Sequence, residues 1–360
     1  MIRQQRKLPQ DSGAASHWID PAAWLLVFLL FFLTAMPVEA REIVDMTGRK
    51  VNVPDKIKRV YSTSPPATYM IYALDPSLLA GLNSPLKEVE KKYLSAGIHA
   101  LPVLGGYFGQ GQVANIELIM KVKPDVVIVW TGKESAVNRK MEADMSNLGI
   151  PLIFMNIGRI EDYGRGLKFL GKLLKRESRA RKLADYGEKA LKEVAFATRT
   201  IRPIKRLSVY YAEGPDGLYT ECDTSQHAEL IARVGARNVH RCETKTGYGM
   251  ERISLEQVML YNPDAIFIQE KDFYNRIRQD ARWRRINAVK NNRVFIIPKA
   301  PYNWFDRPPS YMRYLGIKWA MSCLYPELYR VDMAAEARAF YRLFLDLELN
   351  DAQLREIMAG

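Results

Sequence analysis

Two kinds of hydrophobic pattern alternate along most of the chain. Short runs of consecutive apolar residues, such as DVVIVW (125–130) and PLIFMN (151–156), have the length of strands buried on both faces of a parallel sheet. Residues 135–148 between them have helical spacing, so the three segments predict a strand–helix–strand unit. Further strands are predicted at RLSVYYAE (206–213) and RVFIIP (293–298). The alternation predicts an α/β fold with central, mostly parallel sheets.

The start of this region has a more mixed pattern. REIVDMTGRKVNVP (41–54) is typical of a polar hairpin. RVYSTS (59–64) predicts a strand, PATYMIYALD (66–75) a helix and LLAGLN (78–83) another strand. In the second half, GLYTEC (217–222) predicts a further strand, and a short helix is expected at 225–234.

The longest helical pattern covers residues 177–200. Small or apolar residues recur there every three or four positions, and Pro203 ends the pattern. At 1.5 Å per residue such a helix is about 36 Å long, which is enough to run along two small domains. The 360 residues also favour two domains, at roughly 150 residues each. We expect four parts: a signal peptide (1–40), an N-terminal α/β lobe (41–170), a connecting helix (171–203) and a C-terminal α/β lobe (204–360).

One helix-to-strand corner occurs twice in the chain. NIELIMKVKPDVVIV (115–129) and SLEQVMLYNPDAIFI (254–268) each begin with a helix-capping residue and place a Pro-Asp pair before the strand. Each copy also carries a glutamate two positions after its cap, Glu117 or Glu256. A carboxylate in the first helical turn complements the helix dipole. Stabilisation of the helix start explains one glutamate easily, but it explains less well why both copies carry a glutamate at the same position.

The N-terminus has the features of an export signal. Arg3, Arg6 and Lys7 precede an apolar run (22–35) that is short for a membrane span, and a Val-x-Ala site ends at Ala40. We expect a secretory signal peptide that is cleaved after Ala40, with an uncleaved membrane anchor as the alternative. No cysteine follows the apolar run, so lipid attachment at this point is excluded. The expected location is the periplasm.

The net charge narrows the choice of partner. The chain has 53 Lys and Arg against 40 Asp and Glu, a formal net charge of +13. A basic surface suits nucleic acid, anionic lipid or an anionic small ligand. The sequence has no zinc-finger spacing and no polybasic arm, and RIRQDARWRR (276–285) alternates like a solvated helix face. We therefore expect no binding of nucleic acid.

The three cysteines allow more than one interpretation. Cys222 and Cys242 flank a predicted short helix, and we expect them to form a disulfide in an oxidising compartment, whereas Cys323 lies in an apolar helix. Unpaired core thiols are a second interpretation. A zinc site is a third, because His227 and His240 stand near the first two cysteines, although their spacing matches no common zinc motif.

Aromatic residues recur in loops that follow the predicted strands. Ligands of open parallel sheets bind beyond the carboxyl ends of the strands. Any one of these aromatic residues could equally pack the rim of a sheet or contact a ligand. Together they favour the wall of a cleft that binds a flat or bulky ligand. The residues predicted to contact this ligand are Ser64, Tyr107, Trp130, Tyr211, Arg252, Lys271, Tyr302, Trp304, Phe305 and Arg307.

The order of these features resembles the periplasmic binding proteins for ferric siderophores and cobalamin, which serve ATP-binding-cassette (ABC) importers. The resemblance covers nearly all of residues 42–345, with RVYSTSPPATYMIYALDPSLLAGLN (59–83), the first corner motif, the long helix and WRRINAVKNNRVFIIP (283–298) in the expected order. NWFDRPPS (303–310) is similar to the ligand-contacting loop of cobalamin-binding and some siderophore-binding members.

The resemblance implies a mechanism of capture and delivery. It implies a monomer with two lobes bridged by a rigid helix, which binds its ligand in the cleft without a cofactor and without chemistry. Its partner would be a permease dimer with ATPase subunits. Glu117 and Glu256 would then dock onto arginines of the permease, one from each lobe, which gives the repeat its common reason.

The cargo is expected to be a metal chelate. Direct capture of a bare metal ion needs several converging ligands, and the few histidines of the mature chain do not supply them. Arg252, Lys271 and Arg307 suit an anionic chelate, which places a ferric siderophore first. Cobalamin or a related corrinoid is second, followed by haem, a nickel complex or an oxoanion complex. Outside the family, the alternative is a two-lobed glycosyltransferase-like enzyme, but GGYFGQG (105–111) matches no phosphate-binding motif.

Overall fold

The computed structural model describes residues 40–107, 112–130, 135–244 and 249–360. The predicted signal peptide, apart from Ala40, lies outside these residues. Among the described helices, none combines the length and the hydrophobicity that a membrane span requires.

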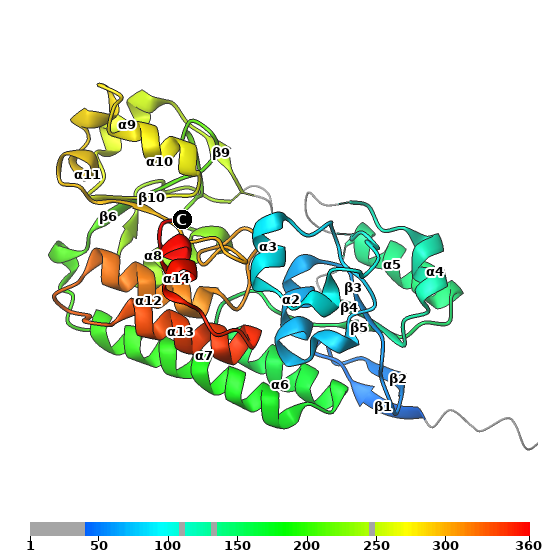
Figure 1. Ribbon diagram of the computed structural model, residues 1–360. Coiled ribbons are helices and arrows are strands. Elements are labelled where there is room, and N and C mark those ends of the chain that lie inside the picture. Colours follow the sequence, from blue (N-terminus) through cyan, green and yellow to red (C-terminus); the bar gives the residue numbers. More distant parts are fainter. Residues whose placement is uncertain (1–39, 108–111, 131–134, 245–248) are drawn as a thin grey trace, which may run out of the picture. The chain divides into compact units, whose positions relative to one another are not determined.

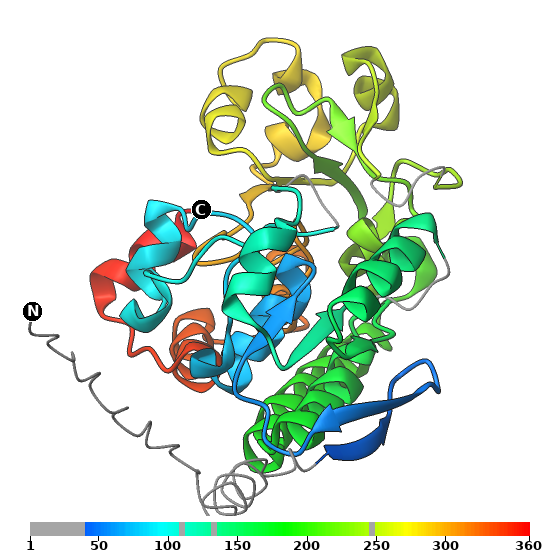
Figure 2. The ribbon, with the colours of Figure 1, turned by 90° about the vertical axis from the view of Figure 1, so that its right-hand side faces the viewer.

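The first half of the described chain contains a hairpin and a parallel sheet. The hairpin strands are β1 (Ala40–Val44) and β2 (Lys50–Pro54). The sheet has the order β3 (Val60–Ser62), β4 (Val126–Val129), β5 (Leu152–Phe154). The helices are α2 (Pro65–Leu74), α3 (Glu88–Tyr93), α4 (Ile116–Val122), α5 (Ala136–Asn147) and α6 (Asp162–Leu174), with 3-10 turns η1 (Pro76–Leu78) and η2 (Ala96–Ile98). The hairpin lies beside the end of α6, where Lys175 and Asp55 form an ion pair of 2.7 Å (Figure 2).

The second half contains a larger parallel sheet. Its order is β11 (Val294–Ile296), β10 (Ala265–Ile268), β6 (Ser208–Ala212), β8 (Arg237–Asn238), and β7 (Tyr219–Thr220) pairs separately with β9 (Glu251–Arg252). The helices are α8 (Glu229–Arg233), α9 (Leu255–Tyr261), α10 (Lys271–Ile277), α11 (Asn287–Lys290), α12 (Arg313–Leu324), α13 (Met333–Leu345) and α14 (Asp351–Met358), with 3-10 turns η3 (Pro203–Lys205), η4 (Gln226–Ala228) and η5 (Trp283–Arg285). The α/β fold with parallel sheets is confirmed (Figure 1).

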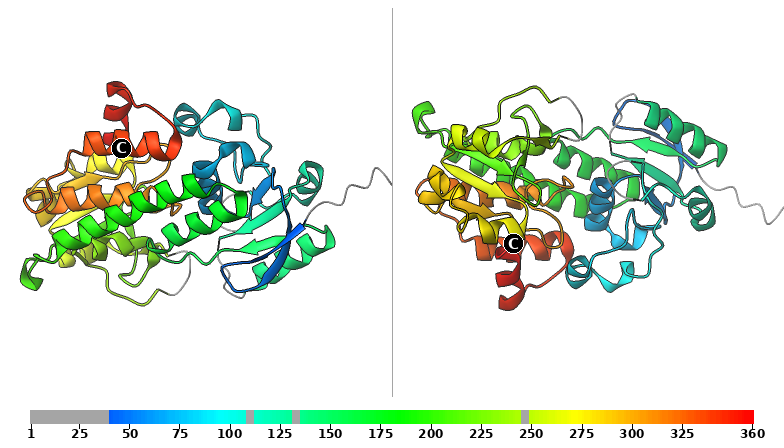
Figure 3. Two further views of the ribbon diagram at one scale, coloured as in Figure 1. Left: turned by 90° about the horizontal axis from the view of Figure 1, so that it is seen from below. Right: turned by 90° about the horizontal axis from the view of Figure 1, so that it is seen from above.

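The predicted long helix is α7 (Glu177–Thr198), which packs against α6 and α12 (Figures 1 and 3). Glycine makes the contact with α12 close, because a Cβ added at Gly187 would lie 2.2 Å from the ring of Tyr314. At the turn between α6 and α7, a Cβ on Gly171 would lie 2.3 Å from the side chain of Ala180. Small residues thus allow three helices to pack at short distance.

One hydrophobic core reaches both parallel sheets. Along β4, Val126 and Ile128 belong to this core, whereas Val127 and Val129 face a separate cluster on the other side of the sheet. Along β10, Ala265 and Phe267 belong to the shared core, and the alternate residues face another cluster. Buried residues of α6, α7, α12 and α13 complete the shared core. This continuity couples the two sheets through packed helices.

The helix α12 is buried on all sides and contains two buried cations. Arg313 pairs with Glu229 of α8 at 3.1 Å, and Lys318 pairs with Glu193 of α7 at 2.8 Å and Glu336 of α13 at 2.9 Å. A buried charge without a partner is strongly unfavourable, so these pairs fix how α12 meets its neighbours.

Three predicted elements differ from the sequence interpretation. The expected strand at 78–83 forms only isolated bridges, because Ala80 donates its backbone hydrogen bond to Val60 whereas Leu82 donates to Pro102. The segment therefore alternates between two neighbours and builds no ladder with either. The expected strand at 217–222 is reduced to the two residues of β7, and the helix at 225–234 divides into η4 and α8.

The repeated corner forms the same structure twice. Asn115 caps α4 by accepting the backbone N–H of Leu118 at 3.0 Å, and Ser254 caps α9 by accepting that of Gln257 at 3.2 Å. Both helices end on a residue in the left-handed conformation, Lys123 or Asn262.

The aspartate of each corner holds the neighbouring parallel strand. Asp125 accepts the backbone N–H groups of Lys58 and Arg59 just before β3, at 2.7 and 2.8 Å. Asp264 accepts the backbone N–H of Ser208, the first residue of β6, at 2.8 Å. The aspartates of both pairs are thus explained by folding alone, whereas both repeated glutamates are exposed at the surface.

Candidate functional site

Buried charged side chains converge beyond the ends of β6 and β7. Glu213 follows β6, Glu221 follows β7, and Asp306 and Arg307 lie in the loop after β11. Arg307 Nε lies 2.6 Å from Glu213 Oε1 and 3.7 Å from Asp306 Oδ2, and another guanidinium nitrogen of Arg307 pairs with Glu221. All three carboxylates are buried. Together with His227, these residues are called the Arg307 cluster below.

The cluster shifts the protonation of two of its members. Burial raises the pKa of Glu213 to about 8; Arg307 opposes this shift, whereas Asp306 and Glu221 add to it. Burial by itself would lower the pKa of His227, but the nearby charge of Asp306 outweighs it and raises that pKa. The ring nitrogen Nδ1 of His227 lies 2.8 Å from both carboxylate oxygens of Asp306. The cluster therefore surrounds Arg307 with buried carboxyl groups rather than presenting a free cation.

Two carboxylate oxygens of the cluster have unused hydrogen-bonding capacity. Glu213 Oε2 and Glu221 Oε2 are buried and accept no hydrogen bond from any residue that the structure describes. The backbone at 249–250 closes over Glu221, because Met250 N–H donates to Oε1 at 2.9 Å and a Cβ on Gly249 would meet Oε2 at 1.9 Å. Glu221 Oε2 is a favourable partner for a hydroxyl, amide or ammonium donor of a ligand. Glu213, whose pKa is about 8, is mostly protonated at neutral pH, so its free oxygen can also donate a hydrogen bond to a ligand.

Three of the predicted aromatic ligand contacts are core residues. Tyr211, Trp304 and Phe305 have no exposed surface. The Tyr211 hydroxyl donates to Gln269 Oε1 at 2.6 Å, and the indole N–H of Trp304 donates to Tyr341 at 3.3 Å. These side chains pack the loop after β11 against β6 and α13, so they offer no face to a ligand in this structure.

Two of the predicted cations are paired away from Arg307. Arg252 is exposed, forms an ion pair with Asp216 at 2.8 Å and lies over the ring of Tyr219. Lys271 donates to the backbone carbonyl of Gly360 at 2.8 Å, near the C-terminus. The structure therefore does not gather the three predicted cations around one ligand.

The predicted contacts from the first half of the chain lie in loops, and two of them, Ser64 and Trp130, follow strands of the parallel sheet. Ser64 precedes α2, and its buried hydroxyl accepts or donates no hydrogen bond within the described residues. Tyr107 is half-buried and donates to Asp144 at 3.0 Å. Trp130, directly after β4, is also half-buried and meets the ring of Tyr163 edge-on, with centroids 5.7 Å apart. Trp130 keeps exposed surface and remains a predicted ligand contact.

Tyr302 belongs to a small pocket. Its ring stacks on Tyr69 with centroids 3.6 Å apart, and both rings line a cavity of about 30 Å³. This volume suits a water molecule and is far too small for a chelate. A larger pocket of about 350 Å³ lies between α7, α12 and α13, where Tyr186 and the paired Lys318 line it, but it includes none of the predicted ligand contacts.

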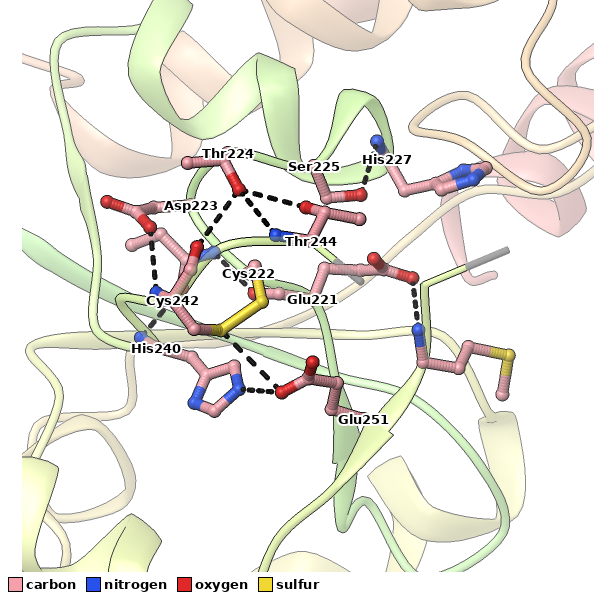
Figure 4. Close-up of a disulfide and its surroundings, with 12 residues drawn as sticks. Glu221, Cys222, Asp223, Thr224, Ser225, His227, His240, Cys242, Thr244 and Glu251 are labelled. Atoms are coloured by element: carbon pink, nitrogen blue, oxygen red, sulfur yellow. Dashed lines mark hydrogen bonds and ion pairs between the residues drawn. A yellow bond between two sulfur atoms is a disulfide. The ribbon is translucent and has the colours of Figure 1, made fainter. Parts of the chain in front are cut away.

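The structure contains the disulfide expected between Cys222 and Cys242 (Figure 4). Cys323 is the free cysteine of the described chain. His240 lies beside the disulfide, with Nε2 at 3.0 Å from Glu251 Oε2, whereas His227 belongs to the Arg307 cluster. The two histidines that stood together in the sequence interpretation thus have different surroundings.

The carboxylates of the Arg307 cluster were not among the residues predicted from the sequence. Glu213 and Arg307 are 94 residues apart in the chain, so no local spacing connects them. A usable signal was the position of Glu213, a charged residue directly after a buried apolar strand. Asp306, next to the predicted Arg307, was a second such signal.

Comparison with known proteins gives matches over most of the chain. The sequence model of the family described as periplasmic binding protein matches residues 73–301. The molybdate-binding protein MolA of Haemophilus influenzae is 25% identical over 348 residues, which cover 89% of this chain and 95% of MolA. The vitamin B12-binding protein of Pectobacterium atrosepticum is 24% identical over 214 residues, covering 59% of this chain and 71% of that protein.

A solved structure supports the same grouping. An ABC transporter solute-binding protein from Sulfurospirillum deleyianum is 36% identical, with a TM-score of 0.83 over 89% of this chain and 99% of that one. The relatives bind solutes for ABC transporters outside the cytoplasm and are not enzymes.

Proposed function

We propose that this chain, which belongs to the periplasmic binding protein family, captures a ferric siderophore and delivers it to the permease of an ABC importer. The chain is the extracytoplasmic binding component of such a transporter, and its relatives are binding proteins without catalytic activity. The chelate, the periplasmic location after cleavage at Ala40 and the monomeric state are parts of the proposal.

The Arg307 cluster carries the proposal for the cargo. A small bare anion would meet three buried carboxylates around Arg307, and a bare cation would meet the guanidinium itself. A chelate offers both hydrogen-bond donors and acceptors on a broad surface, so it can match a site of mixed charge. The free oxygens of Glu213 and Glu221 provide hydrogen-bonding groups, and the half-buried Trp130 provides aromatic surface.

Molybdate is the second candidate, and the similarity to the molybdate-binding protein MolA favours it. An oxoanion would need Arg307 to turn from its carboxylates toward the ligand. Protonation of Glu213, whose pKa is about 8, weakens one of those ion pairs near neutral pH. Molybdate therefore requires Arg307 to leave its carboxylates, whereas a chelate fits the cluster with these ion pairs intact.

A titration of the purified mature protein separates the candidates. The panel contains ferric catecholate, ferric hydroxamate, ferric citrate, cobalamin, haem, nickel–histidine and molybdate, with each iron-free chelator as a control. We expect one ferric chelate to bind with one molecule per chain and to quench indole fluorescence. Saturable binding of molybdate alone would establish the second candidate, and binding of cobalamin alone would make the chain a corrinoid-binding protein.

We also propose that Glu117 and Glu256 dock onto the permease. Each lies in the first turn of an equivalent helix, α4 or α9, and forms no ion pair within the described chain. Exposed apolar side chains accompany them: Met120 is 52% and Leu260 79% exposed. An unpaired carboxylate beside an apolar side chain, present once in each half of the chain, suits a partner made of two subunits.

A further inference from the structure

The disulfide is surrounded by groups that have no part in the proposed capture of a chelate. The Sγ atoms of Cys222 and Cys242, a ring nitrogen of His240 and a carboxylate oxygen of Glu251 all lie within 4.8 Å of one another (Figure 4). His240 Nε2 lies 3.0 Å from Glu251 Oε2, and Cys242 Sγ lies 3.6 Å from the same oxygen. Two sulfurs, one imidazole and one carboxylate are a ligand set that zinc prefers.

We propose that reduction of the Cys222–Cys242 disulfide converts this group into a tetrahedral zinc site. Zinc lies about 2.0–2.3 Å from sulfur, nitrogen and oxygen ligands, so the ligand atoms of a tetrahedral site are roughly 3.3–3.8 Å apart. The separations of 3.0 and 3.6 Å around Glu251 are already close to these values. Completion of the site requires the two sulfurs to separate after reduction and the side chains to rotate toward the metal.

The backbone around the site is held together independently of the disulfide. Asp223 N–H donates to the carbonyl of His240 at 2.9 Å, and Cys242 N–H donates to the carboxylate of Asp223 at 3.1 Å. The hydroxyl of Thr224 donates to the carbonyl of Cys242 at 2.9 Å. These bonds keep the two cysteine-bearing segments adjacent after the sulfur–sulfur bond is cleaved.

A second residue orients the imidazole. His240 Nδ1 lies 3.0 Å from the hydroxyl of Tyr261 in α9. When Nε2 binds a metal, Nδ1 carries the proton and donates a hydrogen bond to the hydroxyl oxygen of Tyr261. Partners of this kind fix the ring orientation and tautomer of metal-binding histidines.

The reaction needs a dithiol as reductant. The dithiol gives two electrons and two protons to the disulfide, forms its own disulfide and leaves two cysteine thiols. Zinc then displaces the two thiol protons into solvent and binds both thiolates, neutral His240 and ionised Glu251. In the oxidised protein the sulfurs are bonded to each other, so the thiolate ligands do not exist.

Cobalt(II) titration of the mature protein tests the proposal, because cobalt(II) bound to thiolates gives a charge-transfer band and tetrahedral cobalt gives intense visible bands. We expect one cobalt per chain after treatment with a dithiol and removal of the excess, displacement of cobalt by zinc, and no bands in the oxidised protein. Tyr261→Phe should weaken cobalt binding about 10–100-fold. His240→Ala and Glu251→Gln should weaken it more.

Matched variants separate this site from adventitious binding. Glu243→Gln changes an exposed carboxylate next to Cys242, and Cys323→Ser removes the remaining cysteine; neither should change the stoichiometry or the bands. Circular dichroism of the reduced protein should match that of the oxidised protein. Reduced, folded protein without thiolate–cobalt bands would overturn the proposal. So would bands that survive in Cys222→Ser, or loss of native structure on reduction.

Discussion

Arg307 Nε lies 2.6 Å from the Oε1 atom of Glu213, which is buried directly after the central strand β6. The arginine that the sequence offers as a ligand contact is therefore already paired within the protein, with Glu213, Glu221 and Asp306. A ligand at this place has to fit a cluster of mixed charge, and this requirement distinguishes a chelate from a bare ion.

The raised pKa of Glu213 predicts a pH-dependent stability. Because this pKa is about 8 in the folded chain and 4.5 is the ordinary value, the folded state binds more protons between these pH values. The free energy of unfolding therefore falls as pH rises through this window, by at most about 1.4 kcal/mol per pH unit for this group. Urea denaturation at several pH values should show a smaller fall for Glu213→Gln than for the wild-type protein.

The control for this experiment is Glu177→Gln, which changes an exposed carboxylate in the first turn of α7. Its pH dependence should match that of the wild-type protein. An unchanged slope in Glu213→Gln would mean that Glu213 is ionised throughout the window.

Trp304 should act on stability rather than on ligand affinity. It lies in the loop after β11 and is buried against α13, so Trp304→Ala should lower the free energy of unfolding by about 3–5 kcal/mol, the usual effect of deleting a large core aromatic. Trp130 is half-buried, so Trp130→Ala should lower stability less and weaken binding of the chelate more. Denaturation curves and titrations of both folded variants compare the two effects. A stable Trp304→Ala protein that no longer binds would place Trp304 against the ligand.

The docking proposal predicts a loss of transport with binding intact. Replacement of both Glu117 and Glu256 by Ala should leave the affinity for the chelate unchanged, because both side chains are exposed on α4 and α9. Uptake of the chelate by cells that depend on this protein should decrease, and the exposed Glu177→Ala serves as the matched control. Normal uptake by the double variant, or loss of chelate binding, contradicts docking through these residues.

The proposed cleavage after Ala40 predicts a mature protein that begins at Arg41. The intact mass of protein from a periplasmic extract measures this directly. Protein that keeps residues 1–40 and remains in the membrane would support the anchor instead.

The fold was predictable because buried parallel strands are continuously apolar. β4 and β10 follow the repeated corner in the chain, and their apolar runs are unmistakable. The long helix was predictable from its spacing, and the structure places its end at Thr198. The segment at 78–83 was misinterpreted because its apolar residues do not reveal that its backbone bonds alternate between two neighbours.

The candidate site was predictable only in part. Sequence position places Trp304 and Phe305 in a loop beyond a strand, but it does not tell an exposed aromatic from one that packs the loop onto the core. The partners of Arg307 come from segments far apart in the chain, and only tertiary packing brings them together. The location of the site follows from the parallel sheets, whereas its charge balance follows from side chains that no local pattern connects.

Isothermal titration calorimetry with a ferric siderophore is the decisive test of whether this protein captures a ferric chelate. Mature wild-type protein is titrated with the ferric and with the iron-free form, and the two variants Arg307→Met and Arg252→Met are compared with it. We predict one ferric complex per chain, recovered chemically unchanged, little binding of the iron-free form, and an affinity that decreases in Arg307→Met but not in Arg252→Met. Folded protein that binds molybdate and none of the ferric chelates would contradict the account.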